Sequence, residues 1–128
     1  MIRGLGCDVC AIPRMRKIIE NPRFLERWFT AEERAYIDAH NRRAETAAGI
    51  FAAKEAFVKA LGTGFSGLAP DQVCVSHDEN GAPLYALTDR MRAAMEARGA
   101  DAAFLSISHD GDVAMAAAVL EKCTMNNE

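Results

Sequence analysis

Three ionisable side chains have the types and spacing of a site for a metal and a phosphate-bearing substrate. Asp8 lies at the expected end of an N-terminal strand, whereas Glu55 and Lys59 lie four residues apart in an expected helix. Mg²⁺ takes one or two protein carboxylates and completes its coordination with water and substrate phosphates. Asp8 and Glu55 fit as its ligands, and Lys59 could neutralise a transferring phosphoryl group. Taken alone, Glu55 and Lys59 are more simply an i,i+4 surface pair.

Two weaker signals accompany this set. His109 lies between an expected strand and a turn, where its imidazole could contact a phosphate oxygen or relay a proton. A histidine without a function is the alternative, because turn histidines are common. The glycine-rich residues 62–67 could approach a phosphate closely, but their pattern is too degenerate to define a phosphate-binding loop.

The cysteines support a different hypothesis. Cys7 and Cys10 form a C-x-x-C pair between an expected strand and an expected helix, so a redox or zinc module is an alternative function. Cys74 and Cys123 lie far from this pair, whereas four-cysteine zinc sites usually contain two close pairs. Packing residues that stay reduced in the cytoplasm are the simpler interpretation.

Helical signals occupy most of the chain between its ends. A basic helix is expected from Pro13 to the break at residues 21–22, followed by a short helix around Phe24. Thr30 and Glu33 have the spacing of a capping box, which predicts another helix start. The longest helix is expected over residues 44–61, ended by Gly62. Thr88 predicts the start of a last helix that Gly99 closes.

Strand signals lie at both ends and in one hairpin. A first strand is expected over residues 1–9, ending at Asp8, and a short hairpin around Asn80-Gly81 joins residues 73–75 to 84–87. Residues 103–108 and 113–120 should form a second hairpin through Asp110-Gly111. The expected fold class is α+β, an antiparallel sheet packed with a long central helix.

Size and charge narrow the possible functions. With 128 residues, of which 50% are hydrophobic, residues 1–128 should form one domain with a real core. No targeting signal or long apolar run is evident, so we expect a cytoplasmic protein without a membrane role. A net charge of −3 argues against nucleic-acid binding. Residues 14–27 nevertheless carry five basic and two acidic side chains, which indicates an acidic partner or simply a solvated helix face.

Three sequence blocks together resemble one family along nearly the whole chain. The block G-L-G-C-D-V at residues 4–9 is similar to the family's opening G-x-G-x-D motif. The block F-A-A-K-E-A-F-V-K-A-L-G-T-G at residues 51–64 is similar to its signature helix and is the most specific. The block S-I-S-H-D at residues 106–110 resembles its C-terminal hairpin. The family is that of the holo-acyl-carrier-protein synthases, which are small phosphopantetheinyl transferases.

This resemblance implies a reaction of fatty acid biosynthesis. Phosphopantetheine would pass from coenzyme A to a serine of an acyl carrier protein, with release of 3′,5′-ADP. By resemblance, Asp8 and Glu55 would hold Mg²⁺, Glu55 would accept the serine proton directly or through a water molecule, and Lys59 would stabilise the departing charge. The implied coenzyme-binding residues are Lys59, Gly62, Ser108, His109 and Arg42.

The resemblance also implies partners. The family forms homotrimers with each active site between subunits, so Ser108 and His109 would serve a site whose Asp8 belongs to another chain. Carrier proteins are acidic, and the implied docking residues are Arg14, Arg23 and Arg27.

Two positions depart from the family's pattern. Ile50 replaces an arginine that many members have, so the 3′-phosphate of coenzyme A would need another partner, Arg42 or Arg43. Glu20 replaces a residue that is often basic on the docking helix.

A relative that binds carrier protein without catalysis is a further alternative, against which the intact set of Asp8, Glu55 and Lys59 argues.

Overall fold

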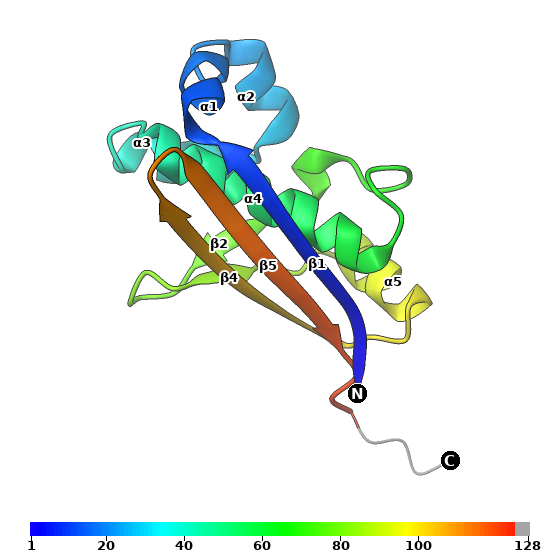
Figure 1. The fold of residues 1–128 in the computed structure, drawn as a ribbon. Coiled ribbons are helices and arrows are strands. Elements are labelled where there is room, and N and C mark those ends of the chain that lie inside the picture. The colour runs from blue at the N-terminus through cyan, green and yellow to red at the C-terminus, as the bar shows by residue number, and fades with distance from the viewer. Residues whose placement is uncertain (125–128) are drawn as a thin grey trace.

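The structure, a computed structural model, describes residues 1–124 as a three-stranded antiparallel sheet with one long helix across a face (Figure 1). β1 (Ile2–Ala11) and β4 (Ala102–Asp110) flank the central β5 (Val113–Glu121). The helix α4 (Ala44–Leu61) packs on β1, β5 and β4. No other described element covers the opposite face of the sheet (Figure 1). The expected α+β class is therefore confirmed.

The remaining elements surround α4. The helices α1 (Ile12–Ile18), α2 (Pro22–Trp28) and α3 (Ala31–Ala39) connect β1 to α4. A short 3₁₀ turn (Pro70–Gln72), the hairpin β2 (Val75–His77) and β3 (Pro83–Tyr85), and α5 (Asp89–Ala97) lead to β4. Across residues 1–124, we find no helix that is long and apolar enough to cross a membrane.

α4 is the centre of the core because nearly all of its surface is covered. Fourteen of its 18 residues are buried, which explains a run of alanines rather than a narrow apolar stripe. Gly62 ends the helix in the left-handed conformation, with φ of 79°, as expected of a C-terminal glycine. The hydroxyl of Tyr85 donates a hydrogen bond to the Ala53 carbonyl at 2.6 Å and thereby ties β3 to the helix.

Two glycines of β1 allow the strand to lie directly on α4. A β-carbon at Gly6 would collide with the carbonyl oxygen of Ala56, and one at Gly4 would collide with that of Ala60. Only glycine therefore permits this backbone approach. The contact places Asp8, two residues after Gly6, beside the turns of α4 that carry Glu55 and Lys59.

A fully buried ion pair holds the other side of α4. Lys54 Nζ lies 2.6 Å from Glu33 Oε1, and both side chains are completely inaccessible to solvent. Glu33 also accepts hydrogen bonds from the backbone N–H groups of Thr30 and Val75, and Lys54 donates to the carbonyls of Pro70 and Val73. Burial lowers the pKa of Lys54, and Glu33 opposes this shift. The pair thus joins α3, α4 and the start of β2.

Several local expectations are confirmed, and the differences have physical causes. The capping box at Thr30 forms, and Thr88 caps α5. The first strand does not end at Asp8, because its pairing with β5 continues to Ala11. The second hairpin turns at residues 111–112, since Asp110 still pairs with Val113. Cys10 is buried as expected, but Cys7 is exposed on the uncovered sheet face, so its interpretation as a packing residue is wrong for the single chain.

The close contact between β1 and α4 predicts that Gly6→Ala destabilises the protein. Because the new methyl group meets backbone rather than a movable side chain, the free energy of unfolding should fall by about 1–3 kcal/mol, as measured by urea denaturation. Glu96→Ala, at an exposed position of α5 away from this contact, is the control and should change stability little. Equal stability of Gly6→Ala and the native protein would contradict this account.

Candidate active site

The structure brings Asp8 and Lys59 into direct contact. Lys59 Nζ lies 2.9 Å from Asp8 Oδ1 and donates a further hydrogen bond, at 3.2 Å, to the carbonyl oxygen of Cys7. The hydrogen bond from Asp8, and then its charge, raises the pKa of Lys59. Lys59 is therefore a positively charged ammonium group at neutral pH, and it lies at the edge of the sheet.

Glu55 completes this cluster one turn before Lys59. Its pKa is raised, first by burial and then by the negative charge of Asp8, whereas Lys59 and Arg14 oppose the shift. Two carboxylates and one ammonium group therefore meet where β1 crosses α4. Glu55 and Lys59 are thus more than an i,i+4 surface pair, since Asp8 comes from a strand about fifty residues away in the sequence.

A second group of polar side chains lies at the other flank of α4. A cavity of about 300 Å³ is bordered by His109 at the end of β4 and by Arg43 and Thr46 at the start of α4. Ile50 and Pro83 also line it. Arg43 supplies a permanent positive charge there, and the carboxylate of Glu45 supplies a negative one, so the cavity has polar partners for a ligand that carries charge.

The other residues that the sequence predicted to bind coenzyme A do not lie together in the single chain. The guanidinium of Arg42 points elsewhere, 3.4 Å from Asp38 Oδ1 and 3.1 Å from the Ile19 carbonyl oxygen. Ser108 belongs to the exposed face of the sheet, because it alternates with His109 along β4 and pairs with Met115. Gly62 lies exposed at the C-terminal end of α4, beside Arg98.

The two polar groups are therefore separated within one chain. Asp8 lies on β1 and His109 on β4, which are opposite edges of the sheet with β5 between them (Figure 1). On α4, Ile50 and Lys59 are nine residues apart and thus face opposite sides of the helix. The sequence did not single out Tyr36 or Thr46, which also line the cavity of His109. The sequence could have indicated Thr46 only through its position, one helical turn before Ile50 in α4.

The comparison with known proteins identifies the family. The profile described as "4′-phosphopantetheinyl transferase superfamily" matches residues 4–118. A holo-[acyl-carrier-protein] synthase of Clostridium acetobutylicum is 43% identical over 122 residues, which cover 94% of this chain and 98% of the relative. The chain belongs to the 4′-phosphopantetheinyl transferase superfamily.

Solved structures of this superfamily share the fold. The holo-[acyl-carrier-protein] synthase of Neisseria meningitidis superposes with a TM-score of 0.86 at 30% identity, covering 95% of this chain and 100% of that one. The Helicobacter pylori enzyme, solved in complex with coenzyme A, has a TM-score of 0.80 at 30% identity and covers 91% and 99% of the two chains.

Membership in the transferase superfamily leaves the cysteine hypothesis without support. Cys7 is exposed and Cys10 is buried, because positions three apart on β1 face opposite sides of the sheet. Within residues 1–124, no three His, Cys, Asp or Glu side chains gather closely enough to hold a metal by themselves. A zinc site of the usual four protein ligands therefore does not form in this part of the chain.

The raised pKa of Glu55 predicts that the ionised form of this carboxyl group destabilises the folded protein. A carboxyl group whose folded-state pKa exceeds the usual 4.5 destabilises the fold once pH rises above that range. At pH 7.5, in buffer with EDTA, Glu55→Gln should therefore raise the Tm by a few degrees. The difference should shrink as pH falls through and below 4.5, because the native carboxyl then becomes protonated in both the folded and the unfolded state.

The measurement is differential scanning calorimetry at both pH values, with Glu20→Gln as the control for loss of an exposed carboxylate. A lower Tm for Glu55→Gln than for the native protein at pH 7.5 would contradict the assignment of burial as the dominant cause.

Proposed function

We propose that this chain acts as a holo-[acyl-carrier-protein] synthase in fatty acid biosynthesis. It transfers 4′-phosphopantetheine from coenzyme A to a serine of an apo-acyl carrier protein and releases 3′,5′-ADP. The observation that carries the proposal is the cluster of Asp8, Glu55 and Lys59, which the fold assembles from two of the family's sequence blocks. Full-length similarity to synthases, including one solved with coenzyme A, supports the substrates.

The chain's own residues divide the chemistry as follows. Glu55 accepts the proton of the attacking serine hydroxyl, directly or through a water molecule, because it is a partly buried carboxylate of the cluster. Lys59 lies at the same site and stabilises negative charge on the phosphates as the leaving group departs. His109 and Arg43 hold the anionic end of coenzyme A in the second cavity. Of the two arginines that the sequence offered for the 3′-phosphate, Arg42 and Arg43, we propose Arg43, which lines this cavity.

The carboxylate pair fits Mg²⁺. Burial and then the charge of Asp8 raise the pKa of Glu55, and a divalent cation relieves the repulsion between the two carboxylates. Asp8 and Glu55 would hold the ion, with water and the pyrophosphate of coenzyme A as its remaining ligands. When bound, Mg²⁺ would neutralise charge on the pyrophosphate. Lys59 now contacts Asp8 Oδ1, so the ammonium group must share or yield that oxygen.

The first test is the intact mass of an apo-acyl carrier protein after incubation with this protein, coenzyme A and Mg²⁺. We expect the mass to rise by one phosphopantetheine group, and Asp8→Ala or Glu55→Ala to reduce the rate at least 100-fold. Carrier-protein binding without a mass gain would instead identify a non-catalytic relative and overturn the proposal.

The basic surface of α1 and α2 is the proposed docking site for the acidic carrier protein. Arg14, Arg23 and Arg27 are all exposed, and they begin next to the cluster, since the charge of Arg14 acts on Glu55. Docking between complementary charges mainly raises the association rate and weakens with salt. Glu20 is also exposed, which limits the extent of this surface.

Charge reversal at Arg23 separates docking from chemistry better than reversal at Arg14, which would also disturb Glu55. We expect Arg23→Glu to raise the KM for carrier protein about fivefold or more at low salt, with little change in the KM for coenzyme A. Arg90→Glu, at an exposed position of α5, is the matched control. Equal changes in both KM values would exclude docking at this surface.

We also propose a homotrimer with active sites between subunits. The uncovered face of the sheet exposes large apolar side chains, namely Leu5, Val9, Phe104, Val113 and Met115, and such patches usually mark interfaces. A neighbouring copy would also bring His109 and Arg43 to the Asp8 cluster, which a single chain keeps apart. We further propose that residues 1–128 act as one domain and, because all four cysteines are free, that the protein is cytoplasmic.

Light scattering tests the assembly. The solution mass should be three times 13.9 kDa, and Leu5→Asp should reduce both this mass and the transferase activity, since the active site would lose half of its residues. Transferase activity at native level in a monomeric Leu5→Asp variant would contradict a shared site.

A further inference from the structure

The β2–β3 hairpin forms one wall of the cavity that the proposed function assigns to coenzyme A. His77 of β2, Gly81 of the turn and Pro83 of β3 line this cavity from the hairpin. The start of α4 and the end of β4 supply its other walls. The shape of the cavity therefore depends on where the hairpin lies.

The base of the hairpin is fixed by hydrogen bonds, whereas its tip is not. The backbone N–H of Val75 donates to Glu33 at 2.8 Å, and the hydroxyl of Tyr85 donates to the carbonyl oxygen of Ala53 at 2.6 Å. The described hydrogen bonds of residues 78–82, in contrast, all stay within the turn. Contacts between side chains therefore decide the position of the tip.

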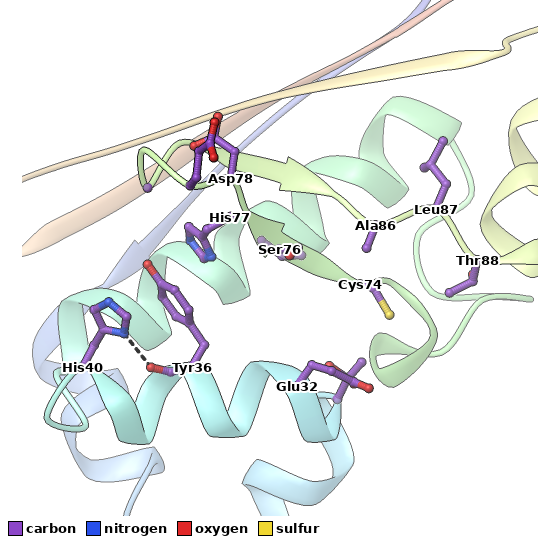
Figure 2. Close-up of a pocket in the computed structure, with 14 residues that line it drawn as sticks. Glu32, Tyr36, His40, Cys74, Ser76, His77, Asp78, Ala86, Leu87 and Thr88 are labelled. Atoms are coloured by element: carbon purple, nitrogen blue, oxygen red, sulfur yellow. Dashed lines mark hydrogen bonds between the residues drawn. The ribbon is translucent and has the colours of Figure 1, made fainter.

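Stacked rings supply such a contact between the hairpin and α3. The ring of Tyr36 lies between the imidazoles of His40 and His77, at centroid separations of 4.0 and 3.8 Å (Figure 2). The planes of the Tyr36 and His77 rings differ by only 2°. His77 also pairs with Pro83 across the hairpin. The stack thus connects α3 to two residues of the cavity wall.

The aromatic ring of Tyr36, and not its hydroxyl group, makes this connection. Across residues 1–124, the hydroxyl forms no hydrogen bond that would hold the hairpin. Tyr36 and His77 also line a neighbouring cavity of about 720 Å³ between α3 and the hairpin (Figure 2). Both cavities adjoin the stack, so the hairpin tip has room to move when the ring is removed.

We propose that Tyr36 is a positioning residue for coenzyme A: its ring, stacked on His77, holds the tip of the β2–β3 hairpin as a wall of the coenzyme cavity. This inference rests on the proposed function. Loss of one aromatic pair shifts an equilibrium by about two- to tenfold, so the stack is expected to tune affinity. It contains none of the residues assigned to proton transfer or to the metal, so the chemical step should change little.

Steady-state kinetics at pH 8 separate positioning from loss of folding. Burial and then the charge of His40 lower the pKa of His77, while Asp78 opposes this shift, so the His77 ring is neutral at this pH. Tyr36→Leu should raise the KM for coenzyme A about fivefold and leave kcat within about twofold. A smaller folded fraction would instead lower the apparent kcat and leave KM unchanged.

Two further variants sharpen the comparison. Tyr36→Phe keeps the ring and should retain the native KM. His40→Ala is the matched control, because His40 stacks on the Tyr36 ring but does not line the coenzyme cavity, and it should leave the KM for coenzyme A unchanged.

A double-mutant cycle tests whether Tyr36 acts through His77. The Kd for coenzyme A is measured by isothermal titration calorimetry with Mg²⁺ and without carrier protein, so that no turnover occurs. Tyr36→Leu and His77→Ala should each weaken binding about fivefold, and the double variant should bind about as well as the weaker single variant. Two effects that multiply independently would show that Tyr36 acts without His77 and would overturn the inference.

The remaining outcomes are equally decisive. The inference alone is overturned if the native protein binds coenzyme A and Tyr36→Leu binds it equally well, or if Tyr36→Phe weakens binding as much as Tyr36→Leu. No binding of coenzyme A by the native protein would instead overturn the proposed function, and this inference with it.

Discussion

The position of the active-site cluster depends on direct backbone contact between β1 and α4. Gly4 and Gly6 have no β-carbon, so the strand can lie against the carbonyl oxygens of Ala56 and Ala60. This close approach brings Asp8 within 2.9 Å of Lys59. A larger residue in the strand would push the carboxylate away from the helix and would separate the two halves of the proposed metal site. The glycines of the G-x-G-x-D block therefore set the position of Asp8, which is a proposed metal ligand.

The Lys54–Glu33 pair stabilises the opposite side of the same helix. Removing one partner of such a pair usually costs about 3–5 kcal/mol, because the other charge remains buried. Here Glu33 accepts hydrogen bonds from backbone N–H groups at the N-terminus of α3 and in the strand β2, so the pair connects these segments to α4. Lys54 and Glu55 are adjacent in sequence, but Lys54 forms the buried ion pair, whereas Glu55 belongs to the candidate active site with Asp8 and Lys59.

The topology of the sheet keeps the two groups of proposed active-site residues apart within one chain. The order β1-β5-β4 places Asp8 and His109 at opposite edges, and α4 fills the space between them on one face. The other face is apolar and uncovered within the described part of the chain. The proposed trimer would bury this face and would bring the two groups together from neighbouring chains.

The sequence alone determined the local elements and the chemistry. The extent of α4, its end at Gly62, and the caps at Thr30 and Thr88 follow from local backbone preferences, and the three motif blocks identified the transferase family. The tertiary structure decided what depends on distant partners. Pairing with β5 extends β1 beyond Asp8, contacts with Asp38 and Ile19 turn Arg42 away from the cavity that Arg43 lines, and Val75 completes the burial of Glu33. These outcomes could not be predicted because local propensity acts over a few residues, whereas each of them depends on a segment that only folding brings into contact.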